Sequence, residues 1–176
     1  RPRPGDLLFA ERRHRPVAGA ARDAAHEPLE GALGELTAES LGPFEARTHA
    51  TIRQIWTVGT HAVQPGGGFW VARHFSANFG RFQADNPALD GYVTIETSDS
   101  DAGFEPWIYM ASGPHGGFRG PQPAIAFRLT EGTLEAGETV TITYGETSAG
   151  GRGLLLPTTS SERMPLPLYV DLDGSG

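Results

Sequence analysis

The sequence predicts an all-β domain, built as an antiparallel two-layer β-sandwich of about seven or eight strands, with a β-barrel as the alternative. From residue 33 onward, apolar and polar residues alternate with a period of two in one short run after another. Gly, Pro, Asp or Ser residues separate these runs, and no helical period of useful length lies between them. Such a series of short strands and turns is typical of a sandwich or a barrel.

Each expected strand follows from its own alternation. The clearest run is 138–145, where Val140, Ile142 and Tyr144 alternate with threonines. In the run 105–112, Trp107 and Tyr109 share one face, while Ile108 and Met110 share the other. The last run contains prolines, which suit an edge strand. The expected strands cover 49–59, 66–75, 91–97, 105–112, 123–132, 138–145 and 166–174.

The first part of the chain has a different composition. Residues 1–30 contain six arginines and five acidic residues, with little alternation. We expect residues 1–32 to form a poorly ordered arm and residues 33–176 to form the β-sandwich domain. The opening "RPRPGD" and the closing "YVDLDGSG" suggest a processed product or a fragment of a longer protein.

Composition excludes several classes of function. The net charge of −7 provides no basic field for nucleic acid. The absence of cysteine excludes disulfides, cysteine-ligated zinc and cysteine catalysis. No apolar run reaches the ~18 residues that a membrane span needs. We expect a periplasmic or secreted protein rather than a cytoplasmic one.

The motifs of common active sites are missing or incomplete. The six histidines have no His-x-His or His-x3-His spacing, so no metal site or cofactor is expected in this chain. The segment "DLDGSG" resembles the start of a calcium loop but ends before the required bidentate acid, so we interpret it as a polar turn. There is no Gly-x-Ser-x-Gly motif. A pair of carboxylates from distant strands would leave no signal in the sequence.

The segment "NFGRFQADNP" (78–87) is rich in aromatic and polar side chains for a connection between strands. Phe79 and Phe82 cannot share one strand face without a bulge, so we expect one to enter the core and the other to cover an end of the sandwich. We expect an internally bonded corner, in which Arg81 bonds to Asp85 or to carbonyl groups of the turn. The alternative is a docking surface. The candidate partner- or ligand-binding residues are Arg81, Gln83, Asp85, Asn86 and Trp107.

The same region resembles a bacterial family that carries a "domain of unknown function" label. The resemblance rests on three segments: residues 79–93, residues 134–153 and residues 167–176. In that family these segments form an N-terminal β-rich region, followed by a part that resembles the polymerase-and-histidinol-phosphatase (PHP) metallohydrolases. The resemblance implies that a divalent metal and the hydrolase activity belong to a catalytic domain missing from this chain.

Three functions follow from these observations. The leading hypothesis is a non-catalytic accessory domain that packs against the missing C-terminal catalytic domain, and it predicts a large exposed apolar surface. The alternative is a free-standing carbohydrate-binding module, which predicts a groove lined by Trp70, Trp107 or Tyr109, although we favour the core for these aromatic residues. A second alternative is an enzyme that uses strand-borne carboxylates. A sugar or another small molecule is thus a candidate ligand.

Overall fold

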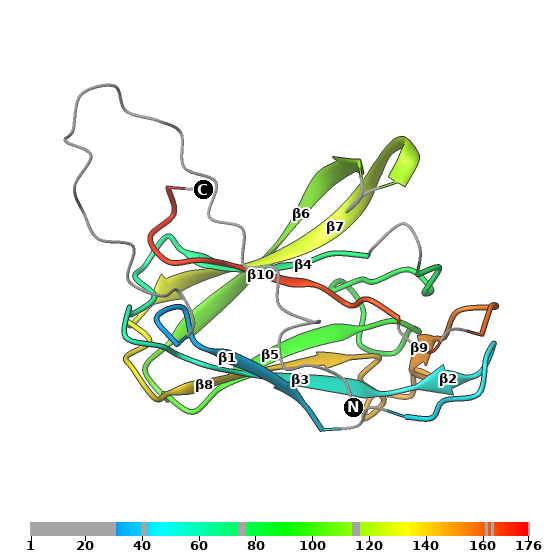
Figure 1. The fold of residues 1–176 in the computed structure, drawn as a ribbon, viewed down its shortest axis with the longest axis horizontal. Helices are drawn as coiled ribbons and strands as arrows, with labels where there is room; N and C mark the ends of the chain where they lie inside the picture. Colours follow the sequence, from blue (N-terminus) through cyan, green and yellow to red (C-terminus); the bar gives the residue numbers. More distant parts are fainter. Residues whose placement is uncertain are drawn as a thin grey trace.

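The computed structural model describes residues 31–39, 42–73, 77–113, 117–160, 162 and 164–175. Within these residues, ten strands form two four-stranded sheets and one two-stranded sheet, and every pair of neighbouring strands is antiparallel. The two larger sheets lie one above the other as the layers of a sandwich (Figure 1). The expected all-β sandwich is therefore confirmed, whereas the barrel alternative is wrong because both sheets keep open edges.

The first layer has the strand order β1-β3-β8-β5. Its strands are β1 (Glu35–Ala38), β3 (Ile52–Thr57), β8 (Thr139–Tyr144) and β5 (Val93–Thr97). The small sheet pairs β2 (His49–Ala50) with β9 (Leu154–Leu155) at one end of this layer. Along β3 and the first four residues of β8, every second residue is buried, as the alternation in the sequence predicts, and Thr143 near the end of β8 is buried as well.

The second layer has the strand order β10-β4-β7-β6. Its strands are β10 (Leu168–Asp171), β4 (Gly68–Val71), β7 (Gly117–Glu131) and β6 (Gly103–Gly113). The long hairpin of β6 and β7 extends past the other strands of its sheet and rises away from both layers (Figure 1). Part of this hairpin therefore has no opposing sheet to pack against.

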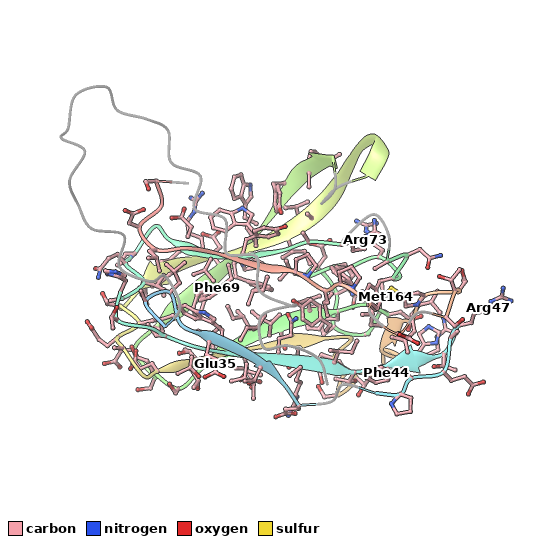
Figure 2. All side chains as sticks on the ribbon, viewed as in Figure 1. Glu35, Phe44, Arg47, Phe69, Arg73 and Met164 are labelled. Atoms are coloured by element: carbon pink, nitrogen blue, oxygen red, sulfur yellow. The ribbon has the colours of Figure 1, made fainter. Side chains whose placement is uncertain are left out.

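The core lies between the layers and is rich in aromatic rings. Trp56 of β3 packs edge-on against Phe69 of β4 with ring centroids 5.2 Å apart, and Phe69 also contacts Phe104 at 5.8 Å. Figure 2 shows Phe69 between the two layers. Ile125, Phe127 and Leu129 of β7 are buried in the same core, as their spacing predicts.

A polar group in this core is fully bonded. The Tyr144 hydroxyl donates to Gln54 Oε1 at 2.6 Å, and Gln54 Nε2 donates to the Leu166 carbonyl oxygen at 2.8 Å. Burial raises the pKa of the Tyr144 phenol, so the hydroxyl stays protonated. The bonds link β3, β8 and the segment before β10, and they meet the requirement that buried polar groups find partners.

The sequence predicted the position of most strands but not of all. Each of the seven expected runs contains a strand, from β3 to β10. It missed β1, which has few apolar residues, and β9, which has only two residues. Residues 1–30 lie outside the described part of the chain, so the expected arm stays a prediction.

Candidate functional site

The corner at residues 78–87 is built differently from the expectation. Phe79 and Phe82 are both buried in the core, with ring centroids 6.3 Å apart, and Phe82 packs against Tyr144 at 5.5 Å. The expectation that one ring would cover an end of the sandwich is wrong, because this segment is not a strand and the alternation of strand faces does not apply to it. A Cβ on Gly80 would lie 2.9 Å from the Leu155 Cβ, so the close approach to β9 requires glycine.

Gln83 organises the loop that follows. Its Oε1 accepts from the backbone N–H groups of Asp85 and Asn86 at 3.0 and 2.9 Å. Its Nε2 donates to the carbonyl oxygens of Asn86 and Leu89 at 2.9 and 3.3 Å. Asn86 Oδ1 in turn accepts from the Ala88 N–H at 3.0 Å. Gln83 is buried and bonded, so the expected internally bonded corner exists, with Gln83 at its centre.

Arg81 does not form the hydrogen bonds within the corner that the sequence predicted. Its side chain is exposed, and within the described residues no hydrogen bond or ion pair joins its guanidinium to Asp85 or to a carbonyl of the turn. The expectation of a bonded Arg81 is therefore wrong. The nearby Arg73 donates from Nη1 to the Phe79 carbonyl oxygen at 3.2 Å, and burial together with the charge of Arg81 lowers the pKa of Arg73.

An ion pair on the surface joins Asp90, at the end of this loop, to Arg152. Asp90 accepts from the backbone N–H of Arg152 at 2.8 Å and from Arg152 Nε at 2.9 Å, and His49 Nε2 lies 3.5 Å from the same carboxylate. The bonds from Arg152 lower the pKa of Asp90 to about 2. The contacts among Asp90, Arg152 and His49 connect the corner to the segment that follows β8. The sequence offers no signal for it, because Asp90 and Arg152 are 62 residues apart.

The outward face of the second layer collects aromatic side chains from three strands. Cross-strand partners share a sheet face, and the register pairs Tyr169 with Trp70, Trp70 with Ala126, and Ala126 with Trp107. Tyr109 lies two residues beyond Trp107 on the same side of β6. We call Trp70, Trp107, Tyr109 and Tyr169 the outer aromatic face.

On β7, the strand between β4 and β6, this face has small residues. Ala124 and Ala126 of β7 point outward between the aromatic strands, yet they are only 6% and 2% exposed. Other atoms of the protein therefore cover these two alanines. Burial, with a smaller effect from Tyr169, raises the pKa of Tyr109 to about 12, so its hydroxyl is protonated at neutral pH. The rings of Trp107 and Tyr109 are 6.3 Å apart and tilted.

Trp107 is the most accessible ring of the outer aromatic face. It is 48% exposed, so the preference for the core is wrong at this position. The Arg128 guanidinium lies 5.1 Å from its ring centroid, in a cation–π contact. The next row along the sheet contains Asp171, Gly68, Arg128 and Glu105, so charged groups border the aromatic row.

The opposite side of β6 is apolar and exposed as well. Ile108 is 42% exposed and Met110 is 60% exposed, although their parity places them on the side that faces the core elsewhere in the sheet. β6 is an edge strand of its sheet, and Met110 also lies beyond the last residue of β4 that pairs with β7. β6 therefore offers two different surfaces, the aromatic one with Trp107 and the aliphatic one with Ile108 and Met110.

The described residues contain no group of three or more His, Asp or Glu side chains that could hold a metal ion. Asp171 Oδ1 accepts from the backbone N–H groups of Asp173 and Gly174 at 3.2 and 3.0 Å, which is the polar turn expected for "DLDGSG". Four of the histidines (14, 26, 74 and 115) lie outside the described residues. In the part of the chain that the structure describes, no helix is long and apolar enough to cross a membrane.

Comparison with known proteins gave no family. No family model matches the chain, and no curated protein matches it. Two similar solved structures come from Clostridium thermocellum. The CBM3a-L domain with flanking linkers from scaffoldin cipA of the cellulosome is 12% identical, with a TM-score of 0.37 over 84% of this chain and 89% of that chain. The family 3a carbohydrate binding module from the cipA scaffolding is 13% identical, with a TM-score of 0.37 over 80% and 97%. At these values the likeness supports no conclusion about function.

Proposed function

We propose that this domain is a carbohydrate-binding module whose ligand lies on the outer aromatic face. The observation that carries the proposal is the row of Tyr169, Trp70 and Trp107, which the strand register places on one side of one sheet. Sugar rings have apolar C–H faces that pack on aromatic rings, and a rigid sheet holds such rings in fixed positions.

The surroundings of the row suit a polar ligand. The protonated hydroxyl of Tyr109 can donate or accept a hydrogen bond, and Glu105 and Arg128 add an exposed acceptor and an exposed donor. Binding sites commonly combine aromatic surface with a few polar groups that fix orientation. A periplasmic or secreted location would bring such a module to polysaccharides.

A second candidate rests on a different observation. Ile108 and Met110 expose aliphatic surface on the projecting hairpin, and exposed apolar surface of this kind often marks a protein interface. This is the surface that an accessory domain would use to pack against a catalytic domain. The PHP-like identity of that catalytic domain, its divalent metal and its hydrolase activity stay predictions from the resemblance.

The alternation of β6 separates the two candidates experimentally. Trp107→Ala changes the aromatic side of the strand, whereas Ile108→Ser changes the aliphatic side one residue away. Affinity electrophoresis in gels that contain soluble polysaccharides would measure sugar binding by the wild type and by both variants.

Carbohydrate binding predicts that the wild type is retarded by at least one polysaccharide, that Trp107→Ala weakens this binding about tenfold or more, and that Ile108→Ser leaves it unchanged. If no polysaccharide retards the wild type, or if only Ile108→Ser weakens retardation, the carbohydrate-binding proposal is wrong. The melting temperature of each variant checks that the domain remains folded.

A further inference from the structure

The charged groups on the outer aromatic face indicate which class of sugar it accepts. Within the described residues of these strands, the outward charged side chains are Asp171 on β10, Arg128 on β7 and Glu105 on β6. All three belong to the row beside the aromatic one. Two carboxylates therefore flank one guanidinium.

The protein partly offsets its single positive charge on this face. Arg128 lies over the Trp107 ring at 5.1 Å, and the register places Glu105 directly opposite it on β6. The Glu105 carboxylate therefore competes with a ligand carboxylate or sulfate for this guanidinium. The rest of the molecule adds no attraction, because the whole chain has a net charge of −7.

The shape of the face favours a chain of sugars over a single ring. The aromatic row crosses β10, β4, β7 and β6, and the ~4.8 Å spacing of strands makes it roughly 14 Å long. This length exceeds one sugar ring. β10 and β6 are the two edge strands of the sheet, so a chain can continue past both ends of the contact.

We infer that the ligand is a neutral, extended polysaccharide that lies across the strands along the aromatic row, and that Glu105 and Asp171 discriminate against acidic polysaccharides. This inference rests on the proposed carbohydrate-binding function. Neutral sugars present hydroxyl groups that can donate to the exposed Glu105 carboxylate, whereas uronate or sulfate groups would be repelled by the negative charges of Glu105 and Asp171.

Isothermal titration of the whole chain with three sugars tests this inference: cellohexaose and mannohexaose as neutral chains, and hexagalacturonate as the acidic chain. At low salt we expect at least one neutral hexasaccharide to bind about tenfold or more tightly than hexagalacturonate, and the corresponding monosaccharide to bind more weakly than the chain. Glu105→Gln should raise the affinity for hexagalacturonate about threefold at low salt. Glu96→Gln removes the same charge from β5 in the other layer and should change nothing.

The outcomes separate the two levels of the proposal. If hexagalacturonate binds as tightly as the neutral chains and Trp107→Ala abolishes both, the carbohydrate-binding function stands and the assignment to neutral sugars is wrong. If neither Trp107→Ala nor Trp70→Phe affects any sugar, or if no sugar binds, the proposed function itself is wrong.

Discussion

The buried bond between Tyr144 and Gln54 allows a quantitative test of the core. Tyr144→Phe removes the hydroxyl that donates to Gln54 Oε1 at 2.6 Å, and that oxygen has no other partner among the described residues. A buried acceptor left without a donor costs about 1–3 kcal/mol. For a domain of this size, each kcal/mol lowers the melting temperature by about 2–4 °C. We therefore expect a decrease of about 2–12 °C.

Denaturant unfolding followed by tryptophan fluorescence would measure this loss. Equal slopes for the wild type and Tyr144→Phe would show that the same surface is exposed on unfolding. Tyr92→Phe is the matched control, because the described residues offer its hydroxyl no hydrogen bond and little change is expected. A Tyr144→Phe variant within about 0.5 kcal/mol of the wild type would refute the reasoning, because surface changes are that small.

Three further predictions concern the corner and the sheet. Gln83→Ala should lower the free energy of unfolding by about 2 kcal/mol, because buried polar groups of the loop lose their hydrogen-bond partner. Arg81→Ala changes an exposed side chain and should lower it by less than about 0.5 kcal/mol. The midpoints of denaturant unfolding compare the two variants. The Asp90 carboxyl should titrate by NMR near pH 2. Its contribution to stability is therefore present above its ordinary pKa and is lost as the pH falls through about 2. Arg152→Ala should raise the titration midpoint of Asp90, and an unchanged midpoint would contradict the ion pair. Gly68→Ala should destabilise the fold by about 3 kcal/mol or more, because the new Cβ would overlap the Phe127 carbonyl oxygen. A melting temperature equal to that of the wild type would show that β4 and β7 do not approach each other this closely.

The strands could be predicted from the sequence where alternation is strong. Val140, Ile142 and Tyr144 are buried as their period predicts, because one face of an antiparallel strand contacts the core while the other contacts solvent. β7 begins at Gly117, earlier than expected, because the glycines and prolines in its first half resemble turn signals.

The candidate site was only partly predictable. The sequence places Trp107 and Tyr109 on one face of their strand, and the structure agrees. Trp70 and Tyr169 lie on the same face because of the order and register of four strands. Pairing between residues far apart in the sequence determines this order and register, and no local pattern predicts it. The failure at Arg81 has the same origin, because its exposure depends on how the corner packs against β9.

The tryptophans provide the most direct measurement of the central claim. Of the three tryptophans, Trp56 is buried in the core, whereas Trp70 and Trp107 belong to the outer aromatic face. Acrylamide quenching of their fluorescence should therefore report mainly on this face, with Trp107 as the most accessible ring. If a saturating neutral hexasaccharide reduces quenching in the wild type but not in Trp107→Phe, the ligand covers this face as proposed. If the sugar binds and quenching stays the same in both proteins, the ligand lies elsewhere and the claim is contradicted.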